Sequence, residues 1–113
     1  MKAYITKKGG HYSAAGLEAV ATTLPTILGD MWNVRVVPAK SEDNTFDPPV
    51  AYVEATLFNL TLCFCADAEV YFNGGVASAS WESRVQMPSD PVEVCKHLLN
   101  CLRDRNRTYI RDV

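Results

Sequence analysis

The sequence predicts an α+β fold: a two-layer sandwich in which a mostly antiparallel sheet of about five strands carries an N-terminal and a C-terminal helix on one face. Apolar residues recur with helical spacing near both ends of the chain, alternate with polar residues through the middle, and are separated there by short turn sequences. With 113 residues, 48% of them hydrophobic, the chain can bury one core. We therefore expect residues 1–113 to form a single α+β domain.

The first expected elements are a short strand at residues 3–6 and a helix that begins after Ser13. An apolar stripe of leucine, valine, alanine and isoleucine follows with helical spacing, and Ser13 can cap its start. Pro25 lacks the backbone donor that a helix uses, so we expect a kink or a restart near Thr23. Gly29 is expected to end the helix.

Alternation of apolar and polar residues predicts the strands of the sheet. The expected strands are residues 32–36, 50–57, 60–66, 69–72 and 76–85. The turns between the later strands are only two or three residues long, which favours antiparallel neighbours. The segment 38–49, PAKSEDNTFDPP, is polar, acidic and proline-bearing, and it predicts a mobile surface loop.

The closing helix has the clearest start signal. Asp90, Pro91 and Glu93 provide an N-cap, a proline at the first helical position and an acidic first turn. An apolar stripe follows, and arginines gather toward the C-terminal end, where cations suit the helix dipole. With both helices on one face of the sheet, alternation predicts that the other face, if nothing covers it, is small, polar and acidic, with Tyr52 and Tyr71 among its side chains.

Charge is unevenly distributed along the chain. The formal net charge is -2, yet residues 41–93 carry nine acidic side chains against Arg84 alone, while residues 1–40 and 94–113 are each net positive. An acidic middle predicts a protein partner with a basic surface, because complementary charge steers association and sets specificity. The net negative charge disfavours nucleic acid as the partner.

Arrangements for catalysis find little support in the sequence. A nucleophile needs a base beside it, and the chain has only His11 and His97. Cys95 is two positions from His97 and therefore lies on another face of the helix. Residues 7–11, Lys-Lys-Gly-Gly-His, resemble an anion-binding turn but lack the spacing of a phosphate loop. We expect a non-catalytic protein.

A zinc site is the strongest metal hypothesis that the sequence offers. Cys63 and Cys65 share a strand face, and His97 and Cys101 are spaced for one face of a helix. The two cysteines of the strand point away from the face assigned to the helices, and neither pair has the spacing of a zinc knuckle. We therefore expect no metal and no other cofactor.

The sequence shows no secretory signal and no apolar stretch long enough to span a bilayer. We therefore expect a cytoplasmic protein with reduced cysteines and no membrane partner.

In size and charge, the chain resembles the small inhibitors carried by phages and other mobile elements, including anti-CRISPR proteins, and the immunity proteins that neutralise nuclease toxins. The resemblance implies a protein-interaction module that binds and inhibits or neutralises a basic, nucleic-acid-handling protein through an acidic surface. Two alternatives stay open: a homodimeric accessory or structural subunit that buries the same sheet face, and a weak nucleic-acid binder that uses the basic termini.

Tyrosines and carboxylates are the candidate contact residues, since tyrosine supplies contact area at low entropic cost and carboxylates pair with arginine or lysine. The residues expected to bind the partner are Tyr52, Glu54, Glu69, Tyr71 and Glu82 on the sheet, with Glu42, Asp43, Phe46 and Asp47 on the loop.

Overall fold

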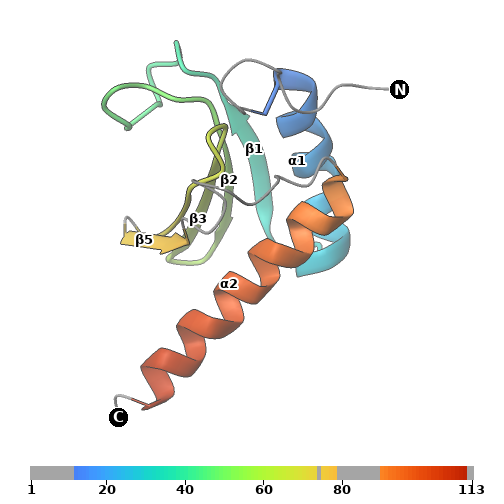
Figure 1. The fold of residues 1–113 in the computed structure, drawn as a ribbon, viewed down its shortest axis with the longest axis vertical. Coiled ribbons are helices and arrows are strands. Elements are labelled where there is room, and N and C mark those ends of the chain that lie inside the picture. Colours follow the sequence, from blue (N-terminus) through green and yellow to red (C-terminus); the bar gives the residue numbers. More distant parts are fainter. Residues whose placement is uncertain (1–11, 74, 79–89, 112–113) are drawn as a thin grey trace.

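A computed structural model describes residues 12–73, 75–78 and 90–111 of the chain (Figure 1). Along the chain the described elements are α1 (Ala14–Leu28), β1 (Asn33–Val37), β2 (Tyr52–Leu57), β3 (Leu60–Cys65), β4 (Val70–Phe72), β5 (Gly75–Ser78) and α2 (Pro91–Arg111). Helices before and after an antiparallel sheet in the chain confirm the α+β class. The strand expected at residues 3–6 and the later part of the strand expected at 76–85 lie outside the described residues.

The strands of the sheet pair in their sequence order, β1-β2-β3-β4-β5, and each described pair is antiparallel. Leu57 pairs with Leu60, so the β2–β3 hairpin turns over the two residues Phe58 and Asn59. Phe58 adopts a φ of 54°, in the left-handed region that few bulky residues enter, and it is 88% exposed. The hairpin tip therefore presents an aromatic ring to solvent on a strained backbone.

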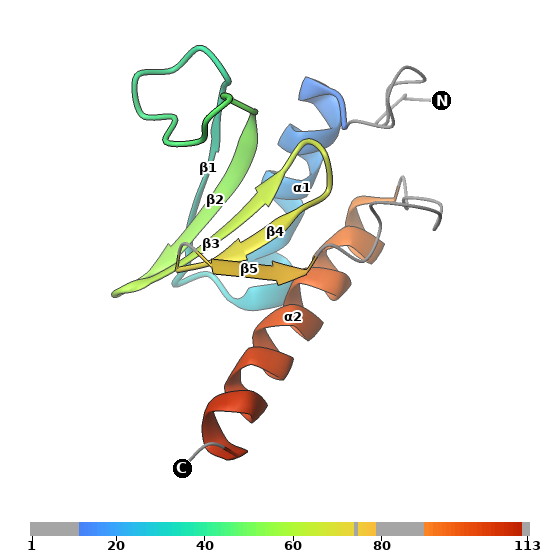
Figure 2. The ribbon, with the colours of Figure 1, turned by 60° about the vertical axis from the view of Figure 1, so that its left-hand side comes forward.

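The main core joins side chains of both helices to side chains of the sheet's central strands. Leu17, Val20 and Leu24 of α1 and Val94, Cys95 and Leu98 of α2 cluster with Val53, Ala55, Leu62, Phe64, Val70 and Phe72 of β2, β3 and β4. The strand residues of this cluster alternate along each strand, as the period of two requires. Their neighbours at positions 52, 54, 63 and 71 consequently point to the opposite face; in Figure 2 α1 lies behind the strands and α2 runs beside them, next to β5.

Helix α1 begins and ends as the sequence predicts, but it does not break at its proline. The backbone N–H of Gly16 donates to the Ser13 hydroxyl at 3.0 Å, and Gly29 donates to the carbonyl of Pro25 at 3.0 Å. The restart expected near Thr23 is wrong, since one helix runs through Pro25 to Leu28. Apolar residues before and after the proline pack against the same core, and this packing outweighs the lost hydrogen bond.

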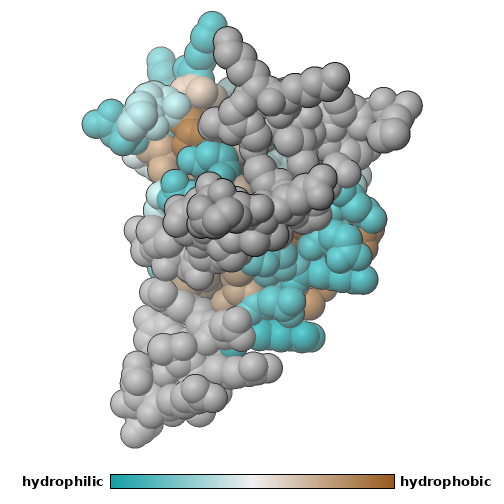
Figure 3. All heavy atoms as spheres, viewed as in Figure 1, coloured by the Kyte–Doolittle hydropathy of each residue, from teal (hydrophilic) through white to brown (hydrophobic). Residues whose placement is uncertain are grey.

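Helix α2 starts at the predicted cap and has one hydrophilic side. The Asp90 carboxylate accepts a hydrogen bond from the backbone N–H of Val92 at 2.9 Å. The outward side of the helix is hydrophilic in Figure 3, and its described exposed residues include Glu93, Lys96 and Arg103. The C-terminal turns of α2 run on past the sheet in Figures 1 and 2. Neither of the described helices is both long and apolar enough to cross a membrane.

Candidate functional site

The segment between β1 and β2 folds over one end of the sheet face that points away from the main core. Its Phe46 ring lies 4.9 Å from the ring of Tyr52 and 5.0 Å from the ring of Tyr71, measured between centroids. Tyr52 and Cys65 are each only 1% exposed beneath it. The condition of an uncovered face is therefore not met at this end, where a second apolar cluster has formed because the loop brings its own aromatic side chain to the sheet.

Asn44 holds the base of this loop together. Its side-chain amide donates to the carbonyl of Pro38 at 3.1 Å and to the carbonyl of Val50 at 2.8 Å, so it joins the two ends of the segment. Its side-chain oxygen accepts from the backbone N–H of Phe46 at 3.1 Å. These three bonds fix the backbone that carries Phe46, whereas the mobility expected for residues 38–49 stays a prediction.

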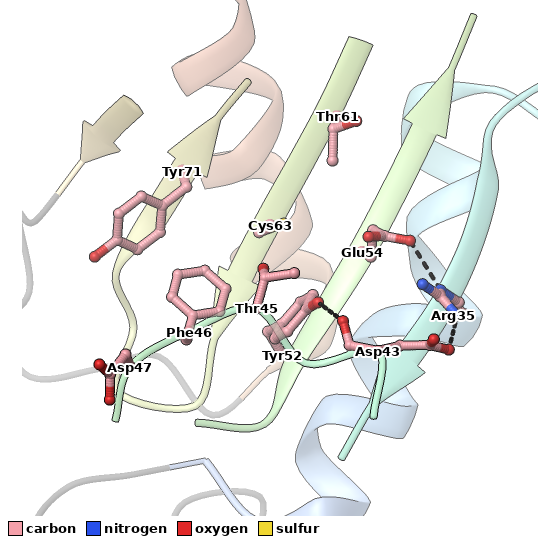
Figure 4. Close-up of a pocket in the computed structure, with 10 residues that line it drawn as sticks. All are labelled: Arg35, Asp43, Thr45, Phe46, Asp47, Tyr52, Glu54, Thr61, Cys63 and Tyr71. Atoms are coloured by element: carbon pink, nitrogen blue, oxygen red, sulfur yellow. Dashed lines mark hydrogen bonds and ion pairs between the residues drawn. The ribbon is translucent and has the colours of Figure 1, made fainter. Parts of the chain in front are cut away.

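The loop and the sheet together enclose a cavity of about 620 Å³, which we call the groove (Figure 4). Its volume lies within the range of ordinary ligand pockets. Aromatic rings, carboxylates and small side chains line it. The lining residues are Arg35, Asp43, Thr45, Phe46, Asp47, Tyr52, Glu54, Thr61, Cys63 and Tyr71.

Arg35 of β1 closes one end of the groove with two ion pairs. Its Nε donates to Glu54 at 2.8 Å, and its Nη1 donates to Asp43 at 3.0 Å. Glu54 faces Arg35 directly in the β1–β2 register, while Asp43 comes from the loop. The hydrogen bond that Arg35 donates to Glu54, followed by the one it donates to Asp43, raises the pKa of the Arg35 guanidinium. Two of the predicted acidic contact residues are thus already bridged by a cation of the same chain.

Tyr71 forms the opposite wall of the groove and is tied to a carboxylate. Its hydroxyl donates to Glu69 at 2.9 Å. This hydrogen bond, with burial as the second cause, raises the pKa of Tyr71 to about 12. The phenol therefore keeps its proton at neutral pH and donates it to Glu69 in this hydrogen bond.

Cys63 lies on the floor of the groove as a protonated thiol. Burial, and then the negative charge of Glu54, raises the pKa of Cys63 to about 11. A thiol is nucleophilic only as the thiolate, so at neutral pH this group is a small, inert surface. The described lining of the groove contains no histidine that could act as its base.

The raised pKa predicts slow modification of Cys63. At pH 8 we expect a disulfide reagent such as DTNB to react with native Cys63 about 100-fold more slowly than with an unfolded cysteine, because a pKa near 11 leaves a thiolate fraction that is smaller by about that factor. The rate should rise about tenfold per pH unit up to about pH 11, and Glu54→Gln should increase it by removing a negative charge. Cys63→Ser identifies the signal. A native rate equal to that of urea-unfolded protein would contradict the assignment.

The four candidate zinc ligands are not brought to one place. Cys65 is buried in the apolar cluster under the loop, whereas Cys101 is buried in the main core, 3.6 Å from the Nε2 of His97. The sheet thus separates the strand pair from the helix pair. Within the part of the chain that the structure describes, no three histidine, cysteine or acidic side chains are grouped as metal ligands.

The groove gathers most of the residues predicted to bind a partner. Six of them line it, and Glu69 joins through its hydrogen bond to Tyr71. Glu42 is exposed on the loop without lining the groove, and Glu82 lies outside the described residues. The sequence interpretation missed four lining residues: Arg35, Thr45, Thr61 and Cys63. Strand alternation could have placed Arg35 on the same face as Glu54, but nothing in the sequence shows the register that joins them.

Comparison with known proteins adds no relative. The chain matches no protein family, no curated protein sequence and no solved structure.

Proposed function

We propose that this protein is a non-catalytic interaction module that binds a basic surface of a nucleic-acid-handling protein and inhibits or neutralises it. The observation that carries the proposal is the groove, which combines aromatic walls with the carboxylates of Asp43, Asp47 and Glu54. The proposal treats the helices as one layer and the sheet as the other, so that the groove face is left for the partner. It also places the protein in the cytoplasm, where such partners act.

The chemistry of the groove fits recognition better than catalysis. Aromatic side chains and charged pairs are typical anchors of protein interfaces. The thiol of Cys63 is protonated, and the carboxylate of Glu54 is engaged by Arg35. Carboxylates at the rim, such as exposed Asp47, are suited to steering a basic partner toward the face.

The test reverses exposed charges on the loop. We expect the double variant Glu42→Lys, Asp47→Lys to bind its partner at least tenfold more weakly and with a smaller dependence on salt, because both carboxylates act through long-range attraction. Glu18→Lys is the matched control, since Glu18 is exposed on α1. The chain would be used to capture a basic protein from host lysate, and that protein would then be purified and titrated against each variant in defined salt.

Three results would contradict the proposal. The captured protein could bind the double variant as tightly as the unmodified chain. Capture could yield only nucleic acid, which would favour the weak nucleic-acid binder. Sedimentation could show a stable dimer that the double variant dissociates, with no other protein bound, which would favour the homodimeric accessory subunit.

A further inference from the structure

The floor of the groove is formed by one strand, β3, and the neighbouring strands β2 and β4 carry its walls. Glu54, Cys63 and Tyr71 form a single row across β2, β3 and β4, because Glu54 pairs with Cys63 and Cys63 pairs with Tyr71. The central member of the row is short, while its two neighbours are long. Two strand spacings separate the outer members, which sets their backbones about 10 Å apart. In Figure 4 Thr61 continues this low floor along β3, and Phe46 stands at the other end.

The walls of the groove suit a flat, positively charged group. Phe46 and Tyr71 offer aromatic rings, whose faces attract cations. Glu54 and Asp43 each give one oxygen to Arg35, and among the described residues no donor engages the second oxygen of either carboxylate. Asp47 adds a further exposed carboxylate to the lining. The only cation in the described lining is Arg35, which is already paired.

Arg35 itself shows which cation these carboxylates accommodate. Its guanidinium reaches Glu54 and Asp43 at the same time through two different nitrogens, 2.8 and 3.0 Å away. A planar fork of donors can do this while its faces stay free to stack on aromatic rings, whereas an ammonium group is a point charge without faces.

We propose that the groove receives an arginine side chain of the partner, with its aliphatic stem over Cys63 and Thr61 and its guanidinium between the free carboxylate oxygens and the rings of Phe46 and Tyr71. This inference rests on the proposed function, since it names the group on the basic partner that the groove recognises.

The test titrates the labelled full chain with capped tripeptides and follows backbone amides by NMR. Capped Gly-Arg-Gly should cause saturable shifts at Glu54, Cys63 and Tyr71, with a dissociation constant on the order of 1 mM for a single side chain. Capped Gly-Lys-Gly should bind at least threefold more weakly. The citrulline peptide, which has the shape of arginine without its charge, should cause no saturable shift.

Two variants locate the binding. Cys63→Leu fills the floor without changing charge and should weaken the arginine peptide at least tenfold. Asp47→Asn should lower the affinity for the arginine peptide about threefold. Asp47 is exposed, so its replacement should have little effect on stability. Glu18→Gln is the matched control because it removes an exposed carboxylate on α1, outside the groove, and it should leave the affinity within about twofold.

The outcomes separate this inference from the proposed function. Equal binding of the arginine and citrulline peptides would contradict the proposal that the groove receives an arginine side chain. Binding of the arginine peptide that neither Cys63→Leu nor Asp47→Asn weakens would contradict it as well. If the captured basic protein still binds the double variant Glu42→Lys, Asp47→Lys more weakly, the proposed interaction module is retained and only arginine binding in the groove is rejected. If that weakening is also missing, both proposals fail.

Discussion

Replacement of Phe64 by alanine is expected to lower the free energy of unfolding by about 3–5 kcal/mol. Phe64 is 1% exposed and lies in the middle of β3, where it pairs with Val53 on one side and Val70 on the other. Its ring also meets the ring of Tyr12 edge-on, with centroids 5.2 Å apart. Since a domain of this kind has about 5–15 kcal/mol in total, the variant should lie close to its unfolding threshold at 25 °C. Urea denaturation followed by circular dichroism measures the loss.

Phe58→Ala is the matched control for Phe64→Ala because it removes the same atoms from an exposed position. Phe58 is 88% exposed, so its replacement should change the free energy of unfolding by no more than about 0.5 kcal/mol. Phe58→Gly should instead stabilise the protein by about 1 kcal/mol, since glycine adopts the φ of 54° without a steric cost. A Phe64→Ala variant as stable as Phe58→Ala would show that β3 is not the centre of the core.

Replacement of Phe46 by alanine is expected to release the loop from the sheet and to cost about 2 kcal/mol. Phe46 is half-buried, and it contributes ring contacts with both Tyr52 and Tyr71, each worth about 0.5–1.5 kcal/mol beyond simple burial. The released loop should expose Cys65, which is otherwise 1% exposed. Urea denaturation gives the loss of stability, and the labelling rate of Cys65 reports the opening.

Phe46→Leu distinguishes the aromatic contacts from apolar burial. Leucine keeps an apolar side chain over Tyr52 but has no ring, so we expect it to retain roughly half of the 2 kcal/mol. Unchanged unfolding and unchanged Cys65 labelling in Phe46→Ala would mean that the loop does not protect the sheet face.

Local patterns in the sequence were enough to predict the elements that the structure describes. Ser13 and Asp90 act as the expected caps, because capping depends on residues within one turn of the helix start. The strands β2 and β3 begin within two residues of their predicted starts, because alternation depends only on which side chains face the core. Pro25 shows the limit of local rules, since the core contacts of its helix outweigh its own preference.

The candidate site depends on contacts that no local pattern encodes. Tyr52 and Tyr71 could be placed on one face by alternation, but the position of Phe46 above them depends on how a long irregular segment folds. Arg35 reaches Asp43 and Glu54 only through that loop and through the pairing of β1 with β2. The acidic character of the face was therefore visible in the sequence, whereas its groove and its internal cation were not.

The two faces of the β2–β3 hairpin differ along its length in a way that bears on how the chain avoids misfolding. Near Tyr52 and Cys65 both faces of the hairpin are apolar and buried. A one-residue shift in strand pairing would therefore only replace one buried apolar side chain by another at this end. Nearer the turn the same shift would drive Glu54 and Thr56 into the core, at the cost of burying a charge and a hydroxyl. The polar residues near the turn thus select the native pairing. Glu54, which lines the groove, also disfavours a shifted register of the β2–β3 hairpin.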